Sequence, residues 1–223
     1  MRLIIAGAGG HGRVVADAAL ATGAYSSLAF LDDRNSNLET SEGWRIVGEL
    51  KSLGNFAAEY HAFVAGVGNA ALRLELLSRA RTLGFNCVSI IHPAAVVSTY
   101  CSIDEGSVVF SGGCINVGAR IGAACIINTG ATVDHDCVLA DGVHVCPGAH
   151  LAGSVEIGPR TWFGVGAVAR EGIKIGADVI VGAGAVVVKD VPDRATVVGN
   201  PARELVRRGR QRDESRDRSG AKD

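Results

Sequence analysis

Apolar residues recur at every sixth position from residue 91 to residue 187, without a gap. Fifteen of these seventeen residues are Ile, Leu or Val, and a second, mostly smaller residue follows four positions after each. A helix would need a period of 3.6 residues and a hairpin array would need longer alternating strands, so this hexad predicts short parallel strands around a prism. The hexad positions are Ile91, Val97, Ile103, Val109, Ile115, Ile121, Ile127, Val133, Leu139, Val145, Leu151, Ile157, Phe163, Ala169, Ile175, Val181 and Val187.

Glycines mark the corners of this predicted prism. They stand at the third place after the aliphatic position in nine hexads, and glycine adopts the positive φ of a tight corner at little cost. We therefore expect each of them to lie at a corner. They are Gly106, Gly112, Gly118, Gly130, Gly142, Gly148, Gly166, Gly172 and Gly184.

The first 82 residues have a different pattern. Apolar stretches at 3–6, 28–31 and 62–65 predict strands, and helical spacing predicts helices after the first stretch and from residue 70 to residue 83. A GxGxxG motif at residues 7–12 separates the first strand from its helix, and an acidic pair follows about 20 residues later, as in dinucleotide-binding folds. About 80 residues are too few for both halves of such a fold. This favours a mononucleotide or nucleotide-sugar site over a nicotinamide site or a purely structural turn.

The charge is nearly balanced but unevenly placed. With 22 basic and 23 acidic residues, the net charge is -1. Residues 203–223 hold 8 basic and 5 acidic residues, which leaves 14 and 18 in residues 1–202. The resulting net charge of -4 argues against a nucleic-acid-binding face on the folded part. Residues 203–223 are expected to be a flexible, solvated tail instead of an RNA-binding one.

The composition also indicates the compartment. No apolar run reaches the 18 residues of a membrane span, and the first residues have the pattern of a strand instead of a signal peptide. We therefore expect a cytoplasmic protein. The six cysteines form no CxxC pair, which suits structural thiols that bind no metal.

Six short segments, taken together, carry a resemblance to a known family. They are residues 7–12, 30–33, 66–69, 91–93, 134–137 and 198–202. On these segments the chain resembles the PglD/NeuD family of sugar acyltransferases over nearly its whole length. The resemblance implies an α/β Rossmann-like nucleotide-sugar-binding domain at 1–82, a left-handed parallel β-helix of 18-residue coils at 83–202, and the tail at 203–223.

The resemblance also implies roles for individual residues. His135 matches the general base, Asp136 the acid that orients it, and Gly153 a backbone donor near the thioester carbonyl. Acetyl-CoA is expected between two prisms of a homotrimer, at His144, Gly153, Asn200 and Pro201. The nucleotide sugar is expected at Gly9, Gly10, His11, Asp32, Asp33, Gly68 and Asn69.

The residue spacing supports part of this assignment independently. His135 and Gly153 are 18 residues apart, which is one coil, so they should stack about 4.8 Å apart on the same face. An imidazole that titrates near pH 6.5 can accept a proton from an attacking sugar amine or hydroxyl. A backbone N–H can stabilise the tetrahedral oxyanion.

Plainer interpretations of several residues remain open at this point. Asp32 and Asp33 could cap a turn at the end of a strand, and Asn69 could cap the following helix. His150 shares the phase of His144 and is expected to be an ordinary surface residue.

Two other classes of protein share the hexad repeat. Together, His135, His144 and His150 raise the possibility of a zinc-dependent γ-type carbonic anhydrase. They lack the 18-residue stacking expected of ligands on one edge, so we expect no metal site. A non-enzymatic hexapeptide scaffold would leave His135 and residues 199–202 unexplained.

The sequence therefore predicts an acetyl-CoA-dependent N-acetyltransferase that acts on a nucleotide-linked amino sugar, such as a 4-amino-4,6-dideoxyhexose. A sugar O-acetyltransferase of the sialic acid type is the alternative. The expected homotrimer would use apolar residues of the outer faces of the prism, namely Phe110, Val117 and Val165. The nucleotide base and the sugar epimer are left open.

Overall fold

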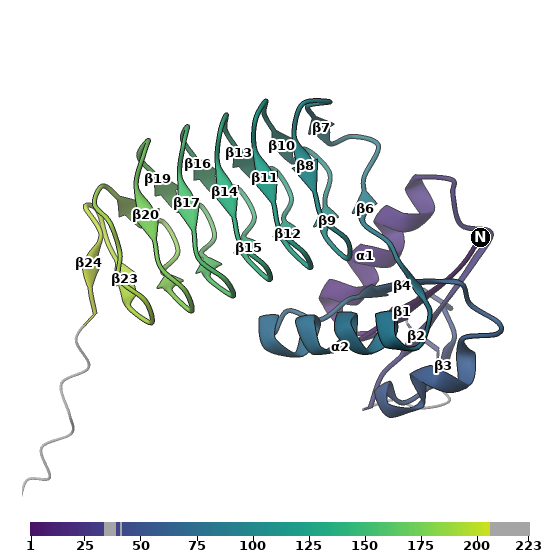
Figure 1. The fold of residues 1–223 in the computed structure, drawn as a ribbon. Coiled ribbons are helices and arrows are strands. Elements are labelled where there is room, and N and C mark those ends of the chain that lie inside the picture. Colours follow the sequence, from purple (N-terminus) through teal and green to yellow (C-terminus); the bar gives the residue numbers. More distant parts are fainter. Residues whose placement is uncertain (34–38, 41, 206–223) are drawn as a thin grey trace, which may run out of the picture.

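The computed structural model describes residues 1–33, 39–40 and 42–205, which form a small α/β domain followed by a long β-helix (Figure 1). The elements of the small domain are β1 Arg2–Ala6, α1 Gly10–Ala21, β2 Ser27–Leu31, β3 Ile46–Gly48, a 3₁₀ helix η1 Leu50–Phe56, β4 Ala62–Ala65, α2 Ala70–Thr82 and β5 Asn86–Cys87. Its five strands form a parallel sheet in the order β3-β2-β1-β4-β5. Leu3 and Ile5 face α1, whereas Ile4 and Ala6 face α2, so alternation along β1 separates the two helical layers.

The strands and helices predicted for the small domain are all present. β3, η1 and β5 were not predicted, because isolated two- and three-residue strands and a single 3₁₀ helix do not repeat and so leave no periodic pattern. β5 pairs with β4 and continues the sheet to Cys87. The last strand of the sheet thus lies beyond residue 82, where the sequence analysis ended the domain.

The β-helix consists of two-residue strands on three faces of a triangular prism. The docking face holds β6 Ile90–Ile91, β9 Val108–Val109, β12 Ile126–Ile127, β15 His144–Val145, β18 Trp162–Phe163 and β21 Ile180–Val181. The β7 face holds β7 Val96–Val97, β10 Cys114–Ile115, β13 Thr132–Val133, β16 His150–Leu151, β19 Val168–Ala169 and β22 Val186–Val187. The β8 face holds β8 Ser102–Ile103, β11 Arg120–Ile121, β14 Val138–Leu139, β17 Glu156–Ile157 and β20 Lys174–Ile175.

The hexad positions are the second residues of these seventeen strands, so the predicted repeat is confirmed strand by strand. All of them from Val109 onward are buried in one continuous core. Ile91 is exposed, and Val97 and Ile103 are only partly buried, because they lie in the first coil with no coil beneath them. The nine corner glycines have φ between 62° and 74°, which confirms their predicted place.

Two corners of the prism position the functional residues. The far corner lies between the β7 and β8 faces and includes residues 116–119, 134–137 and 152–155. The α2 corner lies between the β8 face and the docking face and includes residues 104–107, 122–125 and 140–143. Because the cross-section is a triangle, the far corner is the vertex opposite the docking face.

The small domain covers the first coils of the docking face (Figure 1). Val108 and Ile126 belong to the same buried cluster as α1 and β1. Phe110 is only 2% exposed beneath this domain, so the expectation that it lies on an outer assembly face is wrong. Val117 and Val165 are exposed, as expected.

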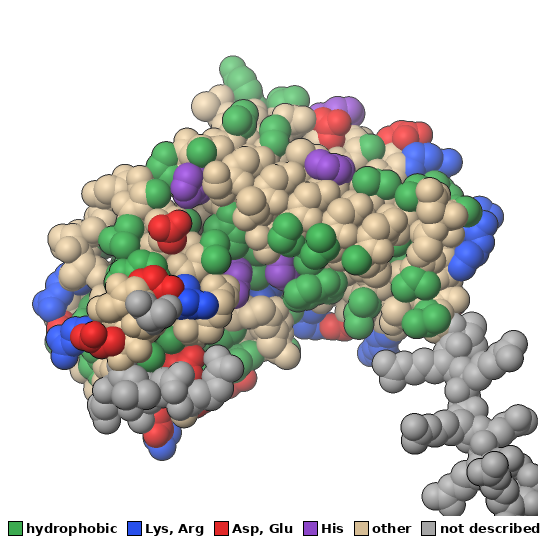
Figure 2. All heavy atoms as spheres, turned by 180° about the vertical axis from the view of Figure 1, so that it is seen from behind, with side chains coloured by type: hydrophobic (Ala, Val, Ile, Leu, Met, Phe, Trp, Pro, Cys, Tyr) green, Lys and Arg blue, Asp and Glu red, His purple; other side chains and the backbone are tan. Residues whose placement is uncertain are grey.

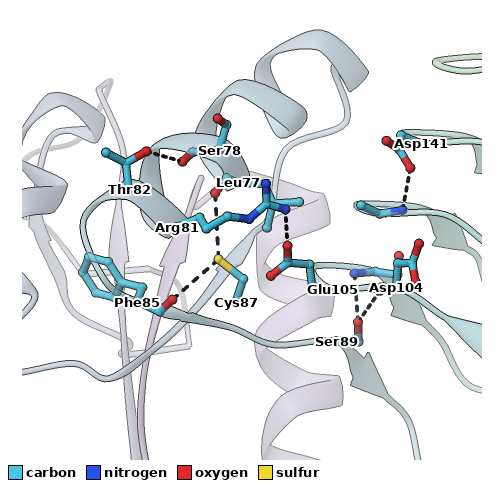
Figure 3. A network of polar contacts seen from close by, with 12 residues as sticks. Leu77, Ser78, Arg81, Thr82, Phe85, Cys87, Ser89, Asp104, Glu105 and Asp141 are labelled. Atoms are coloured by element: carbon cyan, nitrogen blue, oxygen red, sulfur yellow. Dashed lines mark hydrogen bonds and ion pairs between the residues drawn. The ribbon is translucent and has the colours of Figure 1, made fainter.

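The second helix of the small domain runs along the α2 corner (Figure 3). Arg81 forms an ion pair with Glu105, and the Ser89 hydroxyl donates a hydrogen bond to the Asp104 carbonyl at 2.8 Å. Leu77 lies so close to Gly106 that a Cβ there would stand 2.7 Å from the leucine side chain. Helix and corner therefore pack without room for larger corner residues.

The carboxyl end of the described chain closes the β-helix. β23 Thr196–Val198 pairs in parallel with β21, and β24 Arg203–Glu204 returns antiparallel to β23. Strand pairing thus continues past residue 202, where the tail was expected to begin, and residues 206–223 of that tail lie outside the described residues. In the described part of the chain, no helix is long and apolar enough to cross a membrane. All six cysteines are free thiols.

Candidate active site

A pocket of about 460 Å³ opens at the carboxyl ends of β1, β2 and β4. It brings together every residue that the sequence analysis assigned to the nucleotide sugar. It also includes five residues that the analysis did not assign. The lining residues are Gly7, Gly9, Gly10, His11, Asp32, Asp33, Leu50, Gly66, Val67, Gly68, Asn69 and Leu72.

The glycines of this pocket keep two turns close together and leave its floor open. Gly7 has φ 103°, and a Cβ on Gly66 would stand 2.7 Å from the Cα of Gly12, so the turns after β1 and β4 pack backbone to backbone. A Cβ on Gly10 or Gly68 would meet no atom within 4 Å. These two glycines thus border empty space, into which a ligand can approach the backbone.

The two helices that begin at the pocket differ in their caps. Asn69 accepts a hydrogen bond from the Leu72 N–H at 2.9 Å, so its interpretation as the N-cap of α2 is confirmed, although it also lines the pocket. No side chain caps α1 at Gly9. The first-turn N–H groups of α1 carry the positive end of the helix dipole and suit a phosphate group.

Two carboxylates at the end of β2 form one side of the pocket. Asp32 is buried and its Oδ2 accepts a hydrogen bond from the Ala8 N–H at 2.8 Å. The Oδ1 of Asp33 accepts from the Leu50 N–H at 2.8 Å. Both acids therefore brace turns, which agrees with their plainer interpretation, and they still border the pocket. Leu50 was missed because it belongs to η1, which has no sequence signal.

Two histidines meet where the pocket reaches the β-helix. The rings of His11 and His144 lie 6.2 Å apart, between Phe110 and Trp162. The Asn128 amide stands 3.0 Å from His144 Nε2, and when it donates, Nδ1 carries the ring proton. Figure 2 shows histidine side chains at this junction of the two domains.

Burial keeps both imidazoles neutral. Together with the charge of Arg73, it lowers the pKa of His11 to about 4. The same causes, together with His11, lower the pKa of His144 to about 3. Within the described chain, His11 Nε2 and His144 Nδ1 are buried without a hydrogen-bond partner. The pair therefore offers two unused polar atoms beside the pocket.

A second histidine site lies at the far corner. His135 Nδ1 stands 2.9 Å from Asp136 Oδ2, and both side chains are more than half exposed. This hydrogen bond is the main cause that raises the pKa of His135 above its usual value. Asp134 accepts from the His135 N–H at 2.8 Å and from Asn116 Nδ2 at 2.7 Å, which anchors the turn.

Gly118, on the preceding coil, and Gly153, on the following coil, make room for the His135–Asp136 pair. A Cβ on Gly153 would overlap His135 Nε2, and one on Gly118 would overlap Asp136 Oδ1. The predicted stacking of His135 over Gly153 is thus confirmed. Gly153 is buried beneath the His135 ring, and in the described chain its N–H donates to no other atom.

The residues predicted for acetyl-CoA do not form one cluster. Gly153 lies at the far corner, whereas His144 lies on the docking face beside the pocket of the small domain. Asn200 and Pro201 lie next to β22 at the end of the β7 face, where the Ala202 N–H donates to the Val186 carbonyl. One chain therefore presents these residues on two opposite sides of the prism.

His150, the third histidine considered above as a zinc ligand, makes a hydrogen bond with a threonine instead. His150 Nδ1 lies 2.9 Å from the Thr132 hydroxyl. No group of three or more His, Cys, Asp or Glu residues that could hold a metal ion occurs among the described residues. A groove of about 520 Å³ on the β8 face, bordered by the Glu156–Lys174 ion pair, has no counterpart in the sequence analysis.

Known proteins share the fold of this chain. The family described as PglD N-terminal domain matches residues 2–80. The acetyltransferase domain of PglB from Neisseria gonorrhoeae, solved with acetyl coenzyme A, is 42% identical with a TM-score of 0.88, and the match covers 92% of this chain and 98% of that one. The chain is a member of the PglD/NeuD family of sugar acyltransferases.

Other members of the PglD/NeuD family extend the comparison. A mutant of perosamine N-acetyltransferase from Caulobacter crescentus, solved with CoA and GDP-perosamine, is 39% identical with a TM-score of 0.88, and the match covers 92% of this chain and 97% of that one. UDP-N-acetylbacillosamine N-acetyltransferase of Bacillus subtilis is 39% identical over 112 residues. The chain spans 28% to 50% of the length of its curated relatives from Staphylococcus aureus and Bacillus subtilis. The predicted family and fold are confirmed.

The Asp136 carboxylate occupies the space that a side chain at Gly118 would fill. This predicts different effects for alanine at Gly118 and at Gly172, which hold the same turn position on different coils. Gly118 and Gly172 both have φ near 70°, so each substitution should cost about 1–2 kcal/mol of stability. Only Gly118→Ala pushes a Cβ into the Asp136 carboxylate, since Gly172 has no atom within 4 Å of that position. We expect Gly118→Ala to lower acetyltransferase kcat/KM at least tenfold and Gly172→Ala to lower it less than threefold. Equal losses in both variants, measured by CoA release, would contradict the role of this space.

Proposed function

We propose that the protein transfers the acetyl group of acetyl-CoA to the amino group of a sugar linked to a nucleoside diphosphate. The observation that carries this proposal is the His135–Asp136 pair stacked one coil from the free Gly153 N–H. A base and an oxyanion donor side by side are what attack on a thioester needs. The relatives solved with acetyl coenzyme A, or with CoA and GDP-perosamine, support both substrates.

The pocket of the small domain suits the nucleotide sugar. The uncapped first turn of α1, with Gly10 open above it, would bind the diphosphate through backbone N–H groups. Asp32 and Asp33 would accept hydrogen bonds from the ribose or the base. The sugar would then extend toward His11 and His144, whose neutral rings offer hydrogen bonds without repelling an ammonium group.

The position of His135 favours a site built from two copies of the chain. The pocket belongs to the domain on the docking face, and the far corner is the vertex opposite that face. The prism itself separates a bound sugar from the imidazole of its own chain. A contact of one chain's docking face with the partner's far corner uses two different surfaces, and such heterologous contacts form a ring when the rotation from copy to copy closes. We propose a homotrimeric ring, with the exposed Val117 and Val165 in its contacts.

This arrangement also accommodates acetyl-CoA. The thioester would lie at the Gly153 N–H, and the remainder would extend along the prism toward Asn200 and Pro201, about three coils or roughly 14 Å away along the prism axis. His144 would meet the acetyl group only when the partner's far corner approaches the pocket. No metal takes part in this proposal.

Both substrates are intracellular metabolites, and the free cysteines fit a reducing compartment, so we propose a cytoplasmic enzyme.

The reaction follows from these placements. His135 Nε2 takes a proton from the sugar amine as its nitrogen attacks the thioester carbon. The Gly153 N–H stabilises the oxyanion of the tetrahedral intermediate. The carbon–sulfur bond then breaks, and the proton on His135 passes to the leaving CoA thiolate. Asp136 holds the ring so that Nε2 faces the reaction, and it stabilises the imidazolium.

A substrate panel tests this activity. The purified protein is incubated with acetyl-CoA and UDP-, dTDP- and GDP-linked 4-amino-4,6-dideoxyhexoses, and free CoA is measured together with the mass of the product. We expect one amino-sugar nucleotide to gain a single acetyl group on nitrogen, and the His135→Ala variant to be about 10²- to 10⁴-fold slower. A sialic acid arm detects O-acetylation. Turnover of that arm alone would contradict the proposed acceptor.

The raised pKa of His135 sets an expected pH dependence. A base must be neutral to accept a proton, so kcat/KM should rise with pH through a value above the usual 6.5 for histidine. Asp136→Asn should move this rise in kcat/KM, the acidic limb of the pH profile, to lower pH, because it removes the carboxylate that raises the pKa of His135. The same substitution should lower the maximal kcat/KM reached at high pH. His11 and His144 titrate too low to contribute.

His61→Gln, at an exposed histidine in the small domain, is the matched control and should leave the limb unchanged. If the same limb persists at full rate in His135→Ala, then it belongs to the acceptor amine and His135 is not the base.

A further inference from the structure

Arg73 is a buried charge without a carboxylate partner in the described structure. It lies in the first turns of α2 and is 1% exposed, the bulkiest of the fully buried side chains. Burial lowers its pKa to about 10, so the guanidinium still carries its charge at neutral pH. Burying such a charge is costly, and an apolar residue of similar size would fill the space more cheaply.

The hydrogen bonds of Arg73 join two parts of the molecule. Nη1 donates to the carbonyls of Val67 at 3.0 Å and Gly68 at 2.9 Å, both in the loop that lines the pocket. Nε donates to Ala124 at 2.7 Å and Nη2 to Gly142 at 2.8 Å. Ala124 and Gly142 are 18 residues apart, on successive coils of the α2 corner.

The rigid fork of the guanidinium explains why arginine occupies this position. Its donors point in fixed directions in one plane, so one side chain can bind a loop on one side and two stacked coils on the other. A lysine at this position has a single nitrogen and cannot reach all four carbonyls in this geometry. The loop between β4 and α2 is thereby tied to the coil that leads into His144.

We infer that Arg73 is a positioning residue for the acceptor, because it locks the Gly66–Asn69 wall of the pocket to the coils of the β-helix. This role rests on the proposed function, in which the sugar must enter a site completed by the β-helix of another copy. The charge of Arg73 also helps to keep His11 and His144 neutral, since it lowers the pKa of both.

Two neighbouring residues of α2 serve as matched controls. Arg81 also joins α2 to the α2 corner, but through an exposed ion pair with Glu105 (Figure 3), and it does not line the pocket. Leu77 is buried in the same contact, against Gly106, and does not line the pocket either. Leu77→Ala therefore loosens the same domain contact without changing the loop.

The test compares Arg73→Met and Arg73→Lys with Arg81→Met and Leu77→Ala below their melting temperatures. Affinities for acetyl-CoA and for the acceptor found in the panel are measured by calorimetry, together with steady-state kinetics. We expect Arg73→Met to weaken acceptor binding about 10- to 100-fold and to leave acetyl-CoA binding within about twofold, with Arg73→Lys in between. Both controls should keep acceptor affinity within about threefold, even where Leu77→Ala melts earlier. Acceptor affinity that follows thermal stability across all four variants would overturn the inference.

Amide hydrogen exchange separates this inference from the proposed function. In Arg73→Met, exchange should rise at least tenfold over wild type at the two hydrogen-bonded amides that flank the loop between β4 and α2, Gly66, which donates to the Ala6 carbonyl, and Leu72, which donates to Asn69 Oδ1, whereas Arg81→Met should leave it unchanged. If no nucleotide sugar binds the wild-type protein, the proposed function fails and exchange alone decides the role of Arg73. Wild-type protection of this loop in Arg73→Met would overturn the inference whatever the acceptor is.

Discussion

The 18-residue coil is the constraint on which the remaining structure depends. Three hexads bring the chain back to the same face one strand spacing higher, so residues 18 apart stack. This register places His135 over Gly153 and leaves Gly118 as space for Asp136. A shift of one hexad would move the imidazole to another corner and leave the Gly153 N–H without a base. The chemistry therefore depends on the core that keeps the coils in register.

The same register gives histidine two different environments. At the far corner, His135 is exposed and paired with a carboxylate, whose hydrogen bond raises the pKa of the imidazole above its usual value. On the docking face, His144 is 6% exposed and lies near Arg73, which keeps it neutral and restricts it to hydrogen bonding. A single residue type can thus provide proton transfer at one surface and neutral recognition at the other.

Much of this could be predicted from the sequence, because the repeat and the glycines depend on local geometry. Each apolar hexad residue predicts the strand in which it lies, and each corner glycine predicts a positive φ at its own position. The pocket was predictable because its residues follow strand ends in two glycine-rich turns. Contacts between the domains left no such signal. Phe110 has the pattern of an outward residue, and only the docked small domain buries it. Arg73 has the pattern of a solvated helix residue, and two of its four carbonyl partners, Ala124 and Gly142, come from distant segments.

The central claim is that each site combines the pocket of one chain with the far corner of another, and mixing two inactive variants tests it directly. Gly10→Leu fills the pocket, since a Cβ there meets no atom within 4 Å, and His135→Ala removes the base at the corner. Each variant alone should be inactive. Equal amounts co-assembled by unfolding and refolding should recover about one quarter of wild-type activity, because that fraction of shared sites has both parts intact. If the mixture assembles into hybrid rings and stays as inactive as its parents, each site is built within one chain and the account is wrong.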